Sequence, residues 1–92
     1  MHLLGLEIDL LLHESYSLKD KRQIVQSIIK RLQGRYHLTA CQLDQEDLHN
    51  YARIGVGIVS NAHSLAVSQL QKAIDMVEGH YPVDISQVIW IE

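Results

Sequence analysis

Glu7 and Asp9 are the residues whose types and spacing come closest to catalytic chemistry. One residue separates them in an apolar stretch with strand periodicity, so their side chains lie on one face, about 6.5–7 Å apart. His13 lies further along the same row. Two carboxylates placed in this way can hold a hard cation or divide the roles of acid and base. Any amphipathic strand contains such a pair, however, so the alternative is an exposed or interface row without chemistry.

The histidines and the cysteine do not predict a metal site. The histidines show neither H-x-H nor H-x-x-x-H spacing and fall in separate segments: His2, His13, His37, His49, His63 and His80. Cys41 has no partner cysteine for a cluster or a zinc site. Residues 13–17 (HESYS) lack the glycine-rich pattern that cradles phosphates. We therefore assign no catalytic residue, no metal and no cofactor.

Residues 17–36 (SLKDKRQIVQSIIKRLQGRY) hold most of the positive charge. Six of the eight cationic residues lie in this segment together with a single acidic residue, so its charge is +5. Because the formal net charge of the chain is −3, the other segments together carry −8. The six are Lys19, Lys21, Arg22, Lys30, Arg31 and Arg35. On a helical wheel Lys21 lies near the apolar side, and the others flank that side on both edges. The two interpretations are an ordinary solvated face and a site for an anionic partner.

Length and composition indicate one soluble domain over residues 1–92. A chain of 92 residues, 47 % of them hydrophobic, is large enough for a single core. The apolar N-terminal stretch has no positive start and is interrupted by Glu7 and Asp9, so we expect neither a signal peptide nor a membrane span. A single unpaired cysteine is typical of a reducing compartment, and we expect a cytoplasmic protein.

Hydrophobic periodicity predicts the order strand, helix, strand, strand, helix, strand. We expect strands at residues 3–13, 37–43, 52–60 and 83–91, and helices at 17–36 and from 61 or 64 to about 78. Ser17 is expected to cap the first helix, with Asp20 completing a variant of the capping box. Right-handed crossovers then place both helices on one face of a four-stranded antiparallel sheet with the order 4-1-3-2. This is the α+β ferredoxin-like plait (βαββαβ), with residues 44–51 as a longer hairpin loop.

The open face of that sheet is expected to be apolar without forming an aromatic platform. RNA-recognition domains of this topology stack bases on their central strands, where this chain has Glu7, Asp9, Gly55 and Gly57. The apolar residues on this face include Leu3, Leu11 and Val59, joined by one row of the last strand, either Val88/Trp90 or Ile89/Ile91. A contiguous apolar patch of this kind is typical of an interface. We predict a homodimer, formed through this face or through the edge of the fourth strand.

The motif Ser17–Arg22 (SLKDKR) resembles the S-L-K-[DE]-K-R signature of the YlxP-like family, small bacterial proteins with a domain of unknown function. The similarity covers essentially the whole chain and includes Ser27, Arg31-Leu32, Ala40, Asp44, Asp47, Ala52, Ile54-Gly55 and Val59-Ser60. One difference is His49, where family members often carry Trp. The resemblance implies a ferredoxin-like fold and no established activity. Family members are commonly encoded beside transcription-elongation, translation-initiation and ribosome-maturation factors, including ribosome-binding factor A, which implies an accessory role near RNA or the ribosome.

We therefore predict a non-enzymatic accessory protein that binds structured RNA or a ribosomal particle through the basic first helix. Its phosphate contacts would be Lys19, Lys21, Arg22, Lys30, Arg31 and Arg35. The alternatives are a small metal-assisted hydrolase that uses Glu7, Asp9 and His13 on the open face, and a module for protein–protein interaction.

Overall fold

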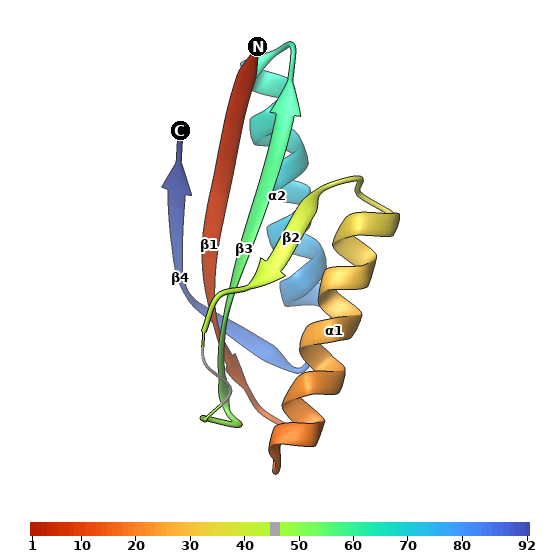
Figure 1. The fold of residues 1–92 in the computed structure, drawn as a ribbon, viewed down its shortest axis with the longest axis vertical. Coiled ribbons are helices and arrows are strands. Elements are labelled where there is room, and N and C mark those ends of the chain that lie inside the picture. The colour runs from red at the N-terminus through yellow and green to blue at the C-terminus, as the bar shows by residue number, and fades with distance from the viewer. Residues whose placement is uncertain (45–46) are drawn as a thin grey trace.

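The helices and strands follow one another in the predicted order. The computed structural model describes residues 1–44 and 47–92, so positions 45 and 46 of the predicted 44–51 loop lie outside the described residues. The elements are β1 (His2–Leu12), α1 (Leu18–Gly34), β2 (Thr39–Gln42), β3 (Tyr51–Ser60), α2 (His63–His80) and β4 (Val83–Ile91). The four strands are antiparallel in the order β2-β3-β1-β4 (Figure 1), which is the predicted 4-1-3-2 counted from the other edge. The α+β ferredoxin-like fold is thus confirmed.

One apolar core fills the space between the sheet and the helices. The strands contribute mainly Leu4, Leu6, Ile8, Leu10 and Leu12 from β1 and Ala52, Ile54 and Val56 from β3. The helices contribute mainly Val25, Ile28 and Leu32 from α1 and Ala66, Leu70, Ala73, Met76 and Val77 from α2. Since α1 buries one side, the rest of its surface faces solvent and carries most of the cations. No helix in the described part of the chain has the length and apolar character to cross a membrane.

α1 begins where its capping residues place it. Ser17 Oγ accepts a hydrogen bond from the N–H of Asp20 at 3.1 Å, and Asp20 Oδ2 accepts one from the N–H of Tyr16 at 3.1 Å. In a standard capping box the second bond returns to the cap residue itself, whereas here it returns to the residue before the cap. Both bonds satisfy backbone donors near the helix start.

The second strand is shorter than predicted. His37 has a positive φ of 55°, in the left-handed region that a strand does not use, so β2 starts at Thr39. Leu38 is buried, and its N–H donates to the carbonyl of Leu32 at 3.0 Å. The chain therefore turns off α1 through these two residues before it joins the sheet as a four-residue edge strand.

A β-bulge decides which residues of β4 face the helices. Asp9 pairs with Gln87 but Leu10 pairs with Ile85, so Ser86 is an extra residue in β4. Beyond the bulge, Val88 and Trp90 pair with the helix-side row of β1, and Ile89 and Ile91 pair with the open-face row. Of the two rows that the sequence left open, Ile89/Ile91 is therefore the one on the open face.

Candidate functional site

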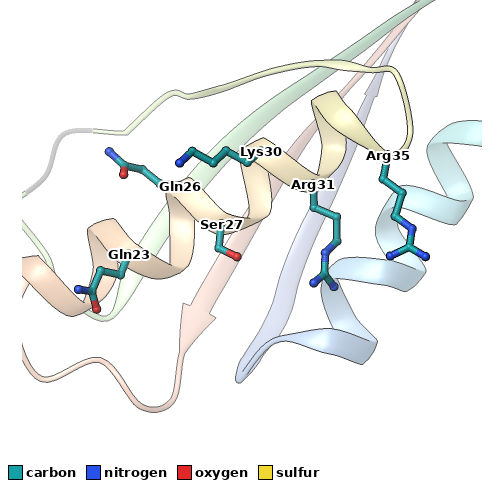
Figure 2. Close-up of a pocket in the computed structure, with 6 residues that line it drawn as sticks. All are labelled: Gln23, Gln26, Ser27, Lys30, Arg31 and Arg35. Atoms are coloured by element: carbon teal, nitrogen blue, oxygen red, sulfur yellow. The ribbon is translucent and has the colours of Figure 1, made fainter.

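The exposed side of α1 carries a shallow hollow of about 580 Å³. Its lining consists of Gln23, Gln26, Ser27, Lys30, Arg31 and Arg35 (Figure 2). These positions recur every three to four residues along α1 and its C-cap residue, Arg35, so they border one surface. Gln23, Gln26, Ser27 and Lys30 lie on the side away from the buried residues, whereas Arg31 and Arg35 flank the buried side. Figure 2 shows Arg31 and Arg35 extending toward α2, while Lys30 and Gln26 extend from the other flank of α1. Cations that lie on different flanks of the helical wheel thus border one surface.

Tyr81, the residue that follows α2, supports this hollow from the side. The guanidinium carbon of Arg31 lies 5.5 Å from the centroid of the Tyr81 ring, within the range of a cation–π interaction. The hydroxyl groups of Tyr81 and Ser27 are 2.9 Å apart and share a hydrogen bond. The residue that follows α2 therefore contacts two lining residues of α1, Ser27 and Arg31.

The positive charge of the hollow is not neutralised within the part of the chain that the structure describes. Among residues 1–44 and 47–92, none of the ion pairs involves Lys30, Arg31 or Arg35. Three cations on adjacent turns repel one another, so an anion that binds between them is stabilised by electrostatic attraction and relieves the repulsion. The amide groups of Gln23 and Gln26 add neutral hydrogen-bond donors beside the charges.

Lys19 and Arg22 lie in the first two turns of α1 with exposed side chains. They extend the basic surface toward the start of the helix, beyond the residues that line the hollow. Arg22 makes a further contact of its own in the structure.

Lys21 does not belong to this surface. Its side chain is 1 % exposed, and its ammonium group donates to Asp44 Oδ2 at 2.6 Å and to the carbonyl of Leu48 at 2.8 Å. A phosphate cannot reach a buried, paired ammonium group, so the prediction of phosphate contact for Lys21 is corrected. The helical wheel placed Lys21 near the apolar side, but Asp44 is distant in sequence and gave no sign that it would receive the charge.

The Asp44 carboxylate accepts hydrogen bonds from three donors. Besides Lys21, the N–H of Arg53 donates to Oδ1 at 2.8 Å and the Gln42 amide donates to Oδ1 at 3.1 Å. Burial opposes the ionised form, but these hydrogen bonds outweigh it and hold the pKa of Asp44 below its ordinary value. The first turn of α1 is thereby attached to the chain between β2 and β3.

The acidic row on the open face does not form a common site. Arg53 donates from Nε to Asp9 Oδ1 at 2.6 Å and from Nη2 to Oδ2 at 3.1 Å, and the Tyr51 hydroxyl donates to Oδ1 at 3.0 Å. The bond from Arg53 holds the pKa of the Asp9 carboxyl below its ordinary value against the opposing effect of burial. The same cluster raises the pKa of Tyr51, through burial first and the Asp9 carboxylate second.

Glu7 and His13 are engaged differently from Asp9. Glu7 is half-buried beside Gly55 and Ile89, while His13 Nε2 lies 2.9 Å from Asp84 Oδ2 at the surface. Across residues 1–44 and 47–92, no three His, Cys, Asp or Glu side chains converge in a way that would hold a metal ion. Both oxygens of Asp9 are occupied by an arginine, so this row lacks the free carboxylate pair that a metal-assisted hydrolase would use.

Comparisons with known proteins agree with the resemblance carried by the SLKDKR motif. Residues 4–89 match the model of a family described as "Protein of unknown function (DUF503)". The chain is also similar to the "Uncharacterized protein YlxP" of Bacillus subtilis (strain 168). The two are 20 % identical over 86 residues, which cover 91 % of this chain and 94 % of the relative.

Proposed function

The chain belongs to the DUF503 family of proteins of unknown function, and we propose that it is a non-enzymatic accessory protein that binds structured RNA, free or within a ribosomal particle. The contact surface is the exposed side of α1. One observation carries the proposal: Lys30, Arg31 and Arg35 border a single hollow without a neutralising carboxylate among the described residues, in a chain of net charge −3.

The lining suits a folded polyanion better than a small ligand. The hollow is shallow and lies along a helix, so an extended phosphate backbone can follow it while the amide and hydroxyl groups of Gln23, Gln26 and Ser27 bond to phosphate or sugar oxygens. Recognition of double-stranded RNA relies on shape, phosphates and 2′-hydroxyl groups rather than on base edges. The acidic remainder of the chain, at −8 outside residues 17–36, limits indiscriminate binding elsewhere on the surface.

Salt-dependent binding to purified bacterial ribosomal RNA tests the proposal. Fluorescence anisotropy between 50 and 200 mM salt should show an affinity that falls with salt, because each phosphate contact releases bound counterions. A Lys30→Glu/Arg35→Glu variant should lose at least about tenfold in affinity and show a shallower salt dependence. Lys19→Glu/Arg22→Glu should weaken binding as well, since these residues extend the same surface.

Lys72→Glu is the matched control, because Lys72 is an exposed cation on α2 outside the hollow. It should bind RNA nearly as well as the unmodified protein. If the α1 variants bind as tightly as the control at every salt concentration, α1 is not the RNA surface. A ribonuclease-treated lysate pull-down gives the complementary result: ribosomal components should be captured before treatment and lost after it.

A further inference from the structure

The open face of the sheet, opposite the helices, contains an apolar groove of about 380 Å³. Its floor is formed by the cross-strand pair Gly5 on β1 and Gly57 on β3, while Gly55, one row further on, is covered by the Leu43 side chain. Leu43 borders the groove beyond β2, and Ile91 borders it on β4. A glycine floor leaves the backbone uncovered where other open-face positions carry side chains, so the groove has room for side chains from outside.

A ridge stands directly beside this groove. Leu3 on β1 pairs with Val59 on β3, and each side chain is 62 % exposed. The two residues lie one row before Gly5 and Gly57 on the same face, a separation of about 6.5–7 Å along the strands. The face therefore presents an exposed apolar pair next to an apolar hollow.

We propose that this face binds a second copy of the same chain. A two-fold axis that runs across the strands between the two rows places Leu3 and Val59 of each copy over Gly5 and Gly57 of the other. In a two-fold symmetric contact the same surface of both copies must be complementary to itself. A ridge that lies beside a groove meets this requirement, because the rotation places the ridge of each copy over the groove of the other. Sheets that pack face to face lie about 10 Å apart, a gap that a large side chain opposite a glycine can fill.

The charges on the open face permit this contact. Asp9 is paired with Arg53 through two hydrogen bonds and lies two rows beyond the glycine row, outside the overlap. Glu7 lies one row beyond the glycines, so the axis separates the two copies of Glu7 by about 20 Å along the strands. That separation exceeds the screening length of about 8 Å at physiological salt, so their repulsion is weak.

The open face is favoured over the free edge of β4 because its relief is self-complementary. Trp90, the largest exposed apolar residue of β4, lies on the helix side of the sheet and takes no part in the proposed contact. The dimer also leaves α1 uncovered, since the helices pack on the other face. RNA binding and dimer formation can therefore be tested, and can fail, separately.

Sedimentation equilibrium of the full chain from about 1 to 500 µM tests the dimer, whose limited overlap places it among the weaker interfaces. The apparent mass should rise with concentration toward twice that of one chain. Gly57→Leu should abolish the rise, because the new side chain fills the groove, while its Cβ meets only the carbonyl oxygen of Leu4 at an ordinary 3.8 Å. Leu3→Ala/Val59→Ala should weaken the dimer at least tenfold by removing the ridge without altering the groove. Leu65→Ala, which trims a 58 % exposed leucine on α2, should dimerise like the unmodified protein.

Mixing the two interface variants tests the arrangement itself. In a mixed pair the intact ridge of the Gly57→Leu chain enters the intact groove of the trimmed chain, and the filled groove meets only small side chains. The mixture should therefore dimerise more strongly than either variant alone. The proposal would be overturned if the unmodified protein stayed monomeric across the concentration range. It would also be overturned if Leu3→Ala/Val59→Ala dimerised as strongly as the unmodified protein, or if the mixture dimerised no more strongly than either variant alone.

Discussion

The ammonium nitrogen of Lys21 lies 2.6 Å from Asp44 Oδ2, and both side chains are almost fully buried. The pair joins the first turn of α1 to the chain between β2 and β3. The residues of the SLKDKR motif therefore have different roles. Ser17 and Asp20 cap the helix and Lys21 anchors it, so Lys19 and Arg22 are the charged members that remain exposed. Part of the SLKDKR motif, whose cations the sequence predicts as phosphate contacts, therefore has a structural role.

Lys21→Ala should destabilise the fold by about 3 kcal/mol. The substitution leaves the Asp44 carboxylate buried without its cation and frees the carbonyl of Leu48, and breaking a buried pair from one side is more costly than never forming it. Urea unfolding followed by circular dichroism measures the loss. Lys19→Ala, two positions earlier and exposed, should change the free energy of unfolding by no more than about 0.5 kcal/mol. Equal stability of the two variants would show that the buried pair contributes nothing.

Acid should remove the stabilisation that Asp9 and Asp44 provide. Both carboxyl groups have pKa values below the ordinary 3.8 in the folded state, so the unfolded chain binds protons first as the pH falls. Their contribution is complete above about pH 5 and disappears as the pH drops below about 4 through the folded-state pKa values. Urea unfolding at a series of pH values should show a flat region and then a steep fall on the acid side.

Arg53→Met should raise the pKa of Asp9. The guanidinium supplies the largest favourable interaction of the carboxylate, and without it the hydrogen bond from the Tyr51 hydroxyl would be left to oppose the effect of burial. A carbon-detected NMR titration of the Asp9 carboxyl measures the change directly. Arg35→Met removes a cation on α1, far from this pair, and should leave the Asp9 titration as it is. An Asp9 titration identical in both variants would mean that Arg53 does not control it.

Tyr81→Leu should weaken RNA binding by about two- to fivefold, the equivalent of one exposed cation–π interaction of about 0.5–1 kcal/mol. The ring orders Arg31 in the hollow, and leucine offers no π face. Tyr81→Phe retains the ring and loses only the bond to Ser27, so it should bind more like the unmodified protein. Anisotropy titrations with ribosomal RNA at a fixed salt concentration compare the three. Indistinguishable affinities of all three proteins would show that the Tyr81 ring does not help Arg31 to bind RNA.

Divalent cations should leave the melting temperature within about 1 °C of its value in buffer. A bound metal stabilises the native state in proportion to its occupancy, and the Asp9 oxygens that a metal would need are held by Arg53 and Tyr51. Thermal melts with Mg²⁺, Mn²⁺ or Zn²⁺ at 1 mM test this, with Glu7→Gln measured alongside. A clear upward shift that Glu7→Gln abolishes would favour the metal-assisted hydrolase instead.

The amino-acid sequence by itself determined the order of the elements and the arrangement of the sheet. Helical spacing over residues 17–36 and alternation in the first and third strands need no long-range information, and handedness rules then leave one strand order. The charge of α1 could also be read directly, since six of the eight cations fall within residues 17–36, and a helical wheel places Lys30 away from the apolar side.

Tertiary structure alone decided the partners of those residues. Lys21 meets Asp44 across 23 positions, and Ser27 meets Tyr81 across 54, distances over which sequence spacing carries no information about contact. The bulge at Ser86 is the clearest case. A single extra residue exchanges the two faces of a strand, so the alternation of Val88, Ile89, Trp90 and Ile91 could not show which pair joins the open face. Only the pairing of β4 with β1 placed Ile91 beside the groove and turned Trp90 toward the helices.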